Sequence, residues 1–445
     1  MKHYHRFHLI PVLPLWMILL LPFGQAQTSW EYHQNPAFHP KAVLDLATDA
    51  GGNLWYVSGS VLGRFDGNTW TSSDFTTAGI QVQYNFLRSL AHAPDGKVWC
   101  GAFDRVLEYS PGANQWVLHN PFNSATNLNG YAMTADPNGK LYWSTSNGWA
   151  EWNGIQWTRN WFYFNTPLGN GIEEYSFRDV VIDQAGEAWF VTPGSIGFET
   201  GFIVPAGIIH QSATDTSVYK MGDLGYPEVL ILPVALNMQG YPMALVGTVE
   251  QNGQVRKLHV LSFEFGAWQN LGEAPTQTAT GLAIYQDPIG NIWIAGQNSP
   301  GQPVVIRRYP DGSWETYLLD NQKISDVYTI TGTPDGSIWV GGRLDTQGVL
   351  ARLPGQFISG TNEISAPCPA FSLVCSGGRI LMPASLSGAA EGQCVVYNSL
   401  GQQMTILSMN DLAEGINVPH WPSGVYFAKI EAKTGCPVQT IRFIK

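Results

Sequence analysis

The side chains best suited to a chemical task are aromatic rings crowded into residues 149–178. They lie beside two charged residues, Glu173 and Arg178, and comprise Trp149, Trp161, Phe162, Tyr163, Phe164, Tyr175 and Phe177. Flat rings next to hydrogen-bonding groups suit the faces of sugars, and a ring with a polar edge suits half-wet recognition sites in general. The stretch therefore predicts a ligand-binding surface, although the same rings could instead pack between structural units.

A second candidate group lies earlier in the chain, at residues 88–105, and combines Phe103 and Asp104 with two arginines. It belongs to the same surface if the repeat described below closes into a ring. Together the two groups give the predicted ligand-binding set, which is Trp149, Trp161, Tyr163, Tyr175, Arg178, Arg88 and Arg105.

Signatures of catalysis are absent from the sequence. There is no HExxH, GxSxG or P-loop motif, and Gly194–Gly197 places a serine between glycines without the spacing of a nucleophile elbow. The histidines are scattered, with no pair at the spacing of metal ligands. We predict no catalytic residue, no metal site and no cofactor.

One phrase, Asp-x-x-Gly followed three residues later by an aromatic residue, recurs along residues 28–358. The Asp and Gly places vary between copies, and the aromatic anchors of the six clear copies are Trp55, Trp99, Tyr142, Trp189, Trp293 and Trp339. The long gap between the fourth and fifth anchors is close to two periods. A degenerate copy with Asn237, Gly240 and Met243 fits inside it, which makes seven units.

Each unit predicts four short strands, the arrangement of a propeller blade. An apolar strand precedes the Asp-x-x-Gly turn, the aromatic strand follows, and a strand that opens with Trp closes most copies, as at Trp70 and Trp116. The recurring aspartates, such as Asp49 and Asp287, would be spread around the ring. We therefore expect them to cap turns and not to form a metal or acid–base site.

Composition supports an all-β chain and disfavours a nucleic-acid partner. Only 13% of the 445 residues are charged, while Gly (48) and Pro (28) are abundant, and both are poor helix formers. The formal net charge is −11. Nucleic-acid binding needs clustered Lys and Arg, which are absent here.

The repeat resembles the two-component-regulator type of propeller repeat, known from periplasmic sensor portions of hybrid signalling proteins. The resemblance covers some 330 residues. It implies the blade type but leaves the ligand open, and because the chain has no spanning helix or kinase, signalling does not follow.

The N-terminus reads as a secretory signal peptide cleaved after Ala26. Lys2 and Arg6 precede an apolar run, Leu9–Phe23, that ends in small residues. The alternative is a membrane anchor, but the run is interrupted by prolines and is shorter than the roughly 20 residues needed to span a bilayer. Just beyond it, Trp30–His33 has no unit of its own, while the seventh unit lacks its last strand. We predict that this segment closes the ring.

The last 80 residues predict a small β-sandwich with two disulfides. Four cysteines lie there, and their three possible pairings stay open; zinc binding is the rival, disfavoured by the lack of a CxxC motif. Seven apolar runs predict its strands, namely Phe371–Cys375, Arg379–Met382, Gln393–Asn398, Met404–Ser408, Ile416–Pro419, Val425–Glu431 and Val438–Ile444, and the cysteines are Cys368, Cys375, Cys394 and Cys436.

Four phrases of this region resemble the type A sorting domain of the type IX secretion system: Val395–Gly401, Leu412–Gly415, Gly424–Lys429 and the basic end Thr440–Lys445. The usual Pro-Asn-Pro opening is replaced by Pro367–Pro369. The resemblance implies an address read by the secretion machinery and then removed, in a Gram-negative bacterium. The alternative is an immunoglobulin-like spacer.

The sequence thus predicts a signal peptide (1–26), a seven-bladed β-propeller (27–358), a linker (359–370) and a C-terminal sorting domain with an immunoglobulin-like β-sandwich fold (371–445). We expect a protein that is secreted or held at the outer cell surface and that has no transmembrane anchor. It would be a non-catalytic module for ligand binding or adhesion, with a glycan or another surface polymer as partner. The alternatives are a polysaccharide lyase or glycosidase with its site in the channel, and a purely structural scaffold.

Overall fold

The computed structural model describes most of residues 29–355 and the strands of the C-terminal region. The predicted signal peptide (1–26) and linker (359–370) lie outside the described residues. The described residues are 29–34, 41–121, 129–146, 148–160, 163–165, 172–174, 177–192, 195–196, 203–204, 207–212, 214–226, 229–249, 255–264, 266–275, 278–298, 301–355, 374–376, 379–381, 392–398, 403–408, 416–418, 421, 425–432 and 439–444.

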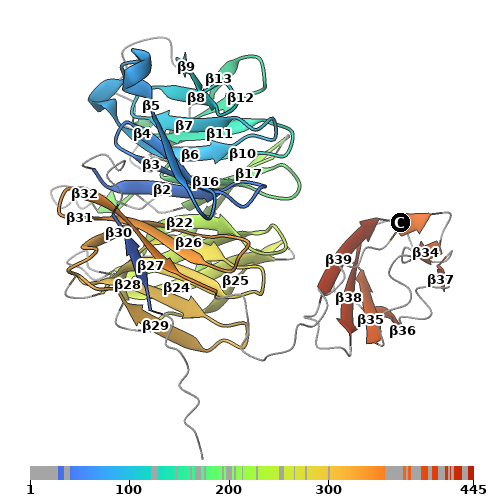
Figure 1. Cartoon of the computed structure of the whole chain (residues 1–445). Helices are drawn as coiled ribbons and strands as arrows, with labels where there is room; N and C mark the ends of the chain where they lie inside the picture. The colour runs from blue at the N-terminus through green and yellow to red at the C-terminus, as the bar shows by residue number, and fades with distance from the viewer. Residues whose placement is uncertain are drawn as a thin grey trace, which may run out of the picture.

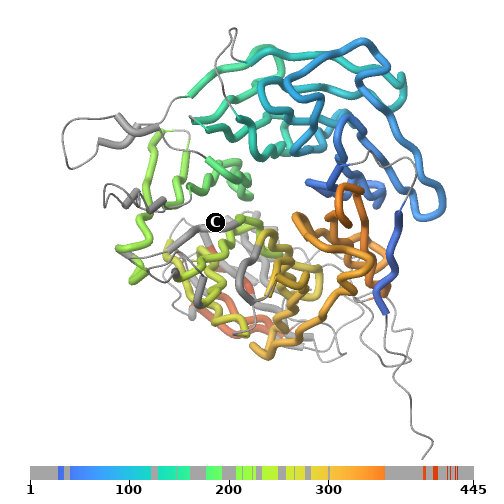
Figure 2. The backbone as a smooth tube through the Cα atoms, turned by 90° about the vertical axis from the view of Figure 1, so that its left-hand side faces the viewer, coloured from blue at the N-terminus to red at the C-terminus, as the bar shows by residue number. Residues whose placement is uncertain are grey.

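Seven four-stranded antiparallel sheets form a seven-bladed β-propeller, which confirms the predicted fold (Figures 1 and 2). In each of the first three blades the strands follow chain order from the innermost to the outermost. They are β2 (Val43–Thr48), β3 (Leu54–Ser58), β4 (Val61–Phe65), β5 (Trp70–Asp74); β6 (Leu87–His92), β7 (Val98–Ala102), β8 (Val106–Ser110), β9 (Gln115–His119); β10 (Gly130–Ala135), β11 (Leu141–Thr145), β12 (Gly148–Trp152) and β13 (Trp157–Asn160).

Blades four to seven repeat this order, with an N-terminal strand added to the last blade. Their strands are β16 (Asp179–Ile182), β17 (Ala188–Thr192), β20 (Gly207–Gln211), β21 (Thr216–Lys220); β22 (Val229–Leu236), β23 (Pro242–Val249), β24 (Val255–Glu264), β25 (Ala267–Glu273); β26 (Thr278–Gln286), β27 (Ile292–Asn298), β28 (Pro303–Arg308), β29 (Trp314–Leu318); β30 (Asp326–Gly332), β31 (Ile338–Leu344), β32 (Gln347–Leu353) and β1 (Glu31–His33).

The recurring aspartates cap the turns between the first two strands, as predicted. In blade six, Oδ1 of Asp287 accepts the backbone N–H of Asn291 at 2.9 Å, and Oδ2 accepts the indole N–H of Trp293 at 2.8 Å. Asp49 holds the ring of Trp55 in the same way at 2.8 Å. Each of these carboxylates therefore makes its hydrogen bonds within its own blade, and the turn fixes the position of the anchor ring.

The anchor rings form the core between neighbouring blades. Trp189, Trp293 and Trp339 are at most 1% exposed, and the second strands of the first four blades are buried along their whole length. In the degenerate unit Met243 takes the anchor place and is fully buried. Losing a buried ring of this size typically costs about 3–5 kcal/mol, so the repeated aromatic residue is a packing requirement.

The N-terminal strand closes the ring, which confirms that prediction. Strand β1 pairs antiparallel with β32, with Glu31 opposite Arg352 and His33 opposite Leu350. The Tyr32 hydroxyl oxygen accepts the backbone N–H of Asp320 at 2.8 Å. Joining the two ends of the propeller removes an exposed sheet edge in the seventh blade.

Blade four corrects one prediction from the sequence. The stretch from Pro193 to Gly225 breaks the period of the repeat, and its sequence predicts an insertion that overhangs the ring. In the structure, residues 207–220 instead supply the blade's outer strands, β20 and β21. The extra structure within it is a hairpin of β18 (Ser195–Ile196) and β19 (Ile203–Val204). Because this blade's outermost strand lacks the closing Trp, the outer half of the unit was not recognisable in the sequence.

Connections between blades carry the remaining short elements. A hairpin of β14 (Tyr163–Asn165) and β15 (Ile172–Glu174) precedes blade four. The 3₁₀ turns η1 (Phe75–Ala78) and η2 (Gln83–Asn85) lie between blades one and two, and η3 (Met221–Leu224) lies between blades four and five. Within the residues that the structure describes, no helix is long and apolar enough to cross a membrane.

The C-terminal region contains a strand at each of the seven predicted runs, in two sheets. The strands are β33 (Val374–Ser376), β34 (Arg379–Leu381) and β37 (Ile416–Asn417) in one sheet, and β36 (Gln403–Ser408), β35 (Gly392–Asn398), β38 (Val425–Ala432) and β39 (Gln439–Ile444) in the other.

The structure does not support the expected pair of disulfides. Cys394 is a buried free thiol in β35, as Cys100 is in β7, and its burial raises the pKa of the thiol to about 11. Cys368 and Cys436 lie outside the described residues, as does the side chain of Cys375. A free Cys394 leaves at most one bridge among the four cysteines, because Cys394 packs in the core of its sheet as a small apolar residue.

Candidate functional site

The innermost strands of all seven blades line one central channel. It has a volume of about 470 Å³ and is bounded by residues of β2, β6, β10, β16, β22, β26 and β30. Figure 2 shows the blades arranged around this axis. A channel of this size falls within the range of small-ligand pockets, which makes it the primary candidate site of the propeller.

β-Bulges near the start of several inner strands help to aim side chains into this channel. The pairing register shifts between Leu87 and Ser89 and again between Val327 and Thr329, so that Arg88 and Tyr328 are the extra residues. A bulged residue is re-aimed relative to its sheet, which is common next to binding sites. The corresponding residues, five places before the turn position of each unit, include Leu44, Arg88, Tyr131, Arg178, Leu282 and Tyr328.

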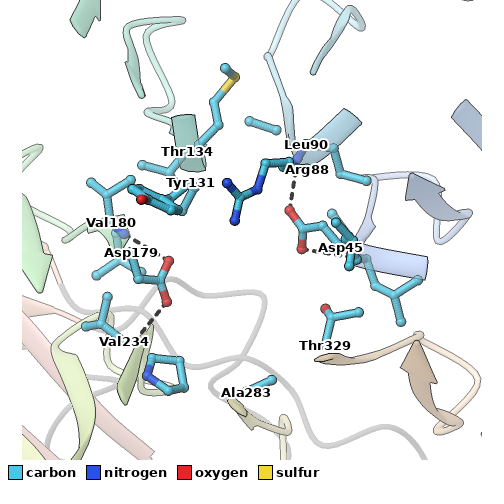
Figure 3. A pocket seen from close by; sticks show the side chains of 18 of the residues that line it. Asp45, Arg88, Leu90, Tyr131, Thr134, Asp179, Val180, Val234, Ala283 and Thr329 are labelled. Carbon is cyan, nitrogen blue, oxygen red and sulfur yellow. Dashed lines mark hydrogen bonds between the residues drawn. The ribbon is translucent and has the colours of Figure 1, made fainter. Parts of the chain in front are cut away.

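Three of these residues form a cation–aromatic–cation arrangement at the wall of the channel. The guanidinium carbons of Arg88 and Arg178 lie 4.7 Å and 4.1 Å from the centroid of the Tyr131 ring. In Figure 3 the Arg88 side chain extends into the pocket beside Tyr131. Burial lowers the pKa of Arg88, and the like charge of Arg178 lowers it further.

Neither guanidinium has a carboxylate partner among the described residues. The ion pairs found there use other arginines, for example Arg105 with Asp104 at 2.8 Å. Two guanidiniums held close together, with no ion-pair partner in the described part of the chain, leave N–H donors available to a ligand. Carboxylate, sulfate and phosphate groups match such donors, because an arginine binds a planar or tetrahedral oxyanion through two parallel hydrogen bonds.

Two carboxylates line the same channel and tie neighbouring blades together (Figure 3). Asp45 accepts the N–H of Leu46 at 2.8 Å and that of Leu90, in the next blade, at 2.9 Å. Asp179 in the same way accepts the N–H of Val234, in the fifth blade, at 3.0 Å. Each aspartate thus joins the inner strands of two neighbouring blades by hydrogen bonds: Asp45 those of blades one and two, and Asp179 those of blades four and five.

Burial also changes the acidity of these carboxylates. Desolvation raises the pKa of Asp45 to about 7, with the negative charge of Asp179 adding to the rise. Desolvation raises the pKa of Asp179 to about 6. Both side chains keep partial contact with the channel, so these two groups change the charge of the channel within the ordinary range of pH.

The structure places the predicted ligand-binding residues in several different environments. Arg88 and Arg178 meet around Tyr131, as described. Arg105 is neutralised by Asp104 in the connection between β7 and β8. Trp149 is only 5% exposed and packs against Phe190 between blades three and four. This burial makes Trp149 a core residue, and it corrects the expectation that its ring faces a ligand.

The other predicted rings are outside what the structure describes. Trp161 and Tyr175 lie outside the described residues, and Tyr163 is described only as part of the backbone of β14. Sequence reasoning missed Asp45, Tyr131 and Asp179. Aligning the units on their turn residues would have revealed these three, because polar or charged side chains stand there at places where other units carry Leu or Ala.

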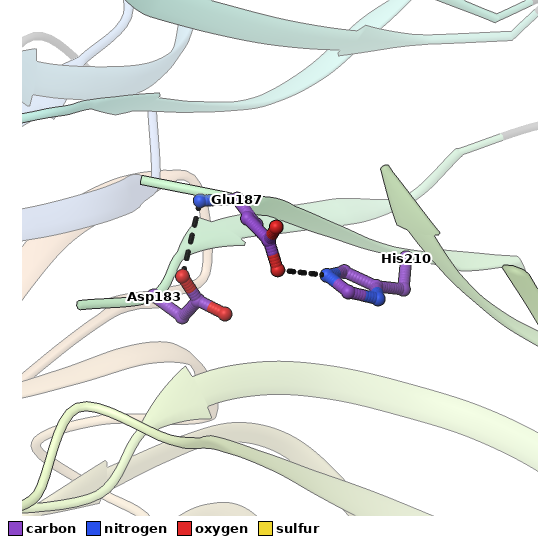
Figure 4. Close-up of side chains that lie close together, drawn as sticks. All are labelled: Asp183, Glu187 and His210. Atoms are coloured by element: carbon purple, nitrogen blue, oxygen red, sulfur yellow. Dashed lines mark hydrogen bonds and ion pairs between the residues drawn. The ribbon is translucent and has the colours of Figure 1, made fainter. Parts of the chain in front are cut away.

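One group of possible metal ligands occurs in blade four, and its contacts favour a structural role. Ligand atoms of Asp183, Glu187 and His210 lie within 4.8 Å of one another (Figure 4). Asp183 is occupied by its turn and by the indole of Trp189 at 2.8 Å. Glu187 and His210 bind each other at 2.7 Å.

The same cross-strand place carries a charged pair in other blades. Lys97 and Glu108 form a 2.7 Å ion pair in blade two, and Lys140 and Glu151 form a 3.0 Å ion pair in blade three. The Glu187–His210 pair of blade four therefore repeats a cross-strand contact of the other blades, with the acidic residue on the opposite strand. The prediction that the protein has no metal site stays a prediction.

Comparisons with solved structures find other β-propellers. Virginiamycin B lyase from Staphylococcus aureus, solved as an inactive variant with quinupristin, matches with a TM-score of 0.55 at 12% identity, over 73% of this chain and 99% of that one. The extracellular domain of a hybrid two-component system from B. thetaiotaomicron matches with a TM-score of 0.50 at 15% identity, over 92% and 57%. PorZ, a surface component of the type-IX secretion system of Porphyromonas gingivalis, matches with a TM-score of 0.50 at 14% identity, over 91% and 59%.

These identities show a common fold and no more. The chain spans less than two thirds of the length of the two-component domain and of PorZ. No protein-family model matches the chain, and no curated protein matches it either. The protein is thus a seven-bladed β-propeller with a polar central channel, followed by a small β region.

Proposed function

We propose that this protein is exported by a type IX secretion system and that its propeller binds an anionic glycan, or another anionic surface polymer, at the channel. It acts there as a binding or adhesion module without catalysing a reaction. The observation that carries the proposal is the arrangement of Arg88, Tyr131 and Arg178. These two guanidiniums, which form no ion pair with any described residue, make an incomplete ion-binding site that a carboxylate or sulfate group completes.

The direct test is calorimetric titration of the purified protein with trigalacturonate, a sulfated oligosaccharide and the neutral sugar maltotriose. We expect binding of the two anionic probes only. Replacing Arg88→Gln or Arg178→Gln should weaken that binding at least tenfold, since a charge-assisted hydrogen bond contributes about 1.5–3 kcal/mol.

The matched control is Arg307→Gln. Arg307 also packs on two aromatic rings, at 4.9 Å from Trp293 and 4.3 Å from Tyr309, but it does not line the channel. Its replacement should leave the affinity unchanged. Equal binding of maltotriose, or an equal loss in the control, would refute the proposed site.

Residues 371–445 support the export part of the proposal through the phrases that resemble a type A sorting domain. The test is expression of the full chain, and of a version truncated before residue 371, in a bacterium with type IX secretion. The full chain should reach the surface or the medium, while the truncated version should stay in the periplasm. Surface display of both versions would contradict this role.

A second candidate is a polysaccharide lyase or glycosidase acting in the same channel. It is favoured by the presence of Asp45 and Asp179, whose raised pKa values suit proton transfer near neutral pH, together with Tyr131 beside two arginines. Incubation with the same anionic polysaccharides distinguishes the candidates. Unsaturated products or new reducing ends, lost in Asp45→Asn, would replace the binding proposal with the enzymatic one.

A further inference from the structure

An exposed tyrosine on a strained turn lies beside the arginine site. Tyr84, in η2, has a φ angle of 63°, and the next residue, Asn85, has 45°. A positive φ is uncommon for a residue with a bulky side chain and costs free energy. The Tyr84 side chain is nevertheless 66% exposed. The strain therefore does not serve to bury the ring in the core.

Several hydrogen bonds hold this turn in place. The N–H of Asn85 donates to the carbonyl of Val82 at 3.0 Å, and the side chain of Asn85 accepts the N–H of Val82 at 3.3 Å. The N–H of Gln83 donates to Asp104, in the connection between β7 and β8, at 3.2 Å. The turn is thus tied to the same connection that carries Phe103.

A continuous row of rings and cations joins Tyr84 to the arginine site. The Tyr84 ring meets Phe103 edge to face, with centroids 5.0 Å apart. The guanidinium carbon of Arg88 in turn lies 4.9 Å from the centroid of the Phe103 ring and 4.7 Å from the centroid of the Tyr131 ring. The exposed ring is therefore two contacts away from the guanidinium that faces the channel.

A further cation extends this row. Phe86 lies 6.1 Å from Phe103, and the Lys41 amine lies 5.0 Å from the Phe86 ring. The residues come from the connections that precede the inner strands and from the one between β7 and β8. In an up-and-down blade these connections lie on one face, so the row lies on one face of the propeller, along blades one and two, and reaches the channel at Arg88.

We propose that Tyr84 is a stacking subsite for a second sugar unit of an extended anionic polysaccharide whose neighbouring unit is held by Arg88 and Arg178. This inference rests on the proposed function. Both guanidiniums pack on Tyr131, which leaves Tyr84 as an open ring beside the site. The axial C–H groups of a pyranose form an apolar face that packs on such a ring through dispersion contacts.

A polymer explains the arrangement better than a single small anion does. A small anion would be held by the arginines alone and would have no use for a strained, exposed ring. Lys41, at the far end of the row, suits a chain that carries acidic groups at intervals. Tyr84 adopts a strained backbone conformation although its ring is exposed. Strained residues of this kind are concentrated at functional sites.

The test compares galacturonate with trigalacturonate as probes, by titration calorimetry of the full protein. The wild type should bind the trimer at least tenfold more tightly than the monomer, and Tyr84→Gly should abolish that preference while leaving monomer affinity unchanged. Glycine adopts positive φ freely, so the melting temperature of this variant should stay equal or rise. Tyr84→Phe, which keeps the ring, should keep the preference for the trimer.

The control variant is Ile155→Ala, which removes an apolar side chain that is 84% exposed in the turn between β12 and β13. That turn lies on the opposite face of the propeller, so the variant should bind both probes like the wild type. An unchanged trimer preference in Tyr84→Gly would overturn the subsite alone. Absence of any binding by the wild type would overturn the proposed function together with the subsite.

Discussion

Binding of a permanently ionised anion at the channel should strengthen as the pH falls from 8.5 to 5. The cause is the protonation of Asp45, whose pKa is about 7, and of Asp179, whose pKa is about 6. Each aspartate is negative at high pH and repels an anion held by the arginines. Because both pKa values are raised, the repulsion is present above them and is lost as the pH falls through them.

His92, Tyr328 and Arg88, which also line the channel, keep their charge state over this range. Burial lowers the pKa of His92 to about 4, so its ring stays neutral. Burial raises the pKa of Tyr328, which therefore keeps its proton. The guanidinium of Arg88 stays charged, because arginine side chains are not deprotonated in proteins. Among the described residues of the channel, the two aspartates therefore carry the change in charge around the ligand.

The size of the effect follows from Coulomb's law. A carboxylate about 8 Å from the anion, in a wet channel with an effective dielectric constant of about 40, repels it by about 1 kcal/mol. Each protonation is then equivalent to about a fivefold gain in affinity. The two together should give about 30-fold between pH 8.5 and pH 5.

The assay is calorimetric titration at several pH values with a sulfated oligosaccharide, which stays ionised throughout. Asp45→Asn should remove the part of the gain centred near pH 7, and Asp45→Asn combined with Asp179→Asn should flatten the whole profile. Thermal melting of each variant controls for the backbone donors that lose an acceptor. An affinity that is independent of pH, or that rises with pH, would refute this electrostatic account.

Three further predictions concern the frame of the propeller. Asp287→Ala should lower the free energy of unfolding by about 3–5 kcal/mol in thermal melts, because it strands several buried donors, whereas Asp66→Ala, in an exposed turn, should lower it far less. Deleting residues 29–34, which include β1, should lower the melting temperature and promote self-association in size-exclusion chromatography, since it bares a sheet edge; an unchanged, monomeric protein would contradict the closure. Added Zn²⁺ or a chelator should leave the melting temperature unchanged, because Glu187 and His210 satisfy each other; a zinc-induced rise that is lost in His210→Ala would show a metal site.

The frame could be predicted from the sequence because it repeats. The turn aspartate and the aromatic anchor obey local rules that hold in every blade, so even the unit with Asn237 and Met243 was placed correctly. The outer half of blade four was not, because its last strand lacks the closing Trp and follows an extra hairpin. In that blade the hairpin of β18 and β19 stands in the sequence between β17 and β20, which pair with each other in the sheet.

The site was predicted only in part, for a different physical reason. Arg88 and Arg178 stand out as charges next to apolar strands, but the aromatic stretch drew attention to Trp149, whose burial depends on the neighbouring blade. Whether a ring packs or faces solvent is a property of the interface between blades. Tyr131 was missed because it becomes significant only through two arginines that are each more than 40 residues distant in sequence.

Departures from the repeat are the most informative feature of the channel. A closed ring of equivalent blades needs small or apolar residues at its axis, and blade six meets that need with Leu282 and Ala283. Arg88 and Arg178 break the pattern although the fold does not require their charges, since other blades close without an arginine at this place. Placing desolvated charges at the axis costs stability, and an anion that completes the arginine pair would offset that cost only when bound. The asymmetry of the axis is therefore the physical basis for locating function in the channel and the adjoining mouth, and not in the turns that all blades share.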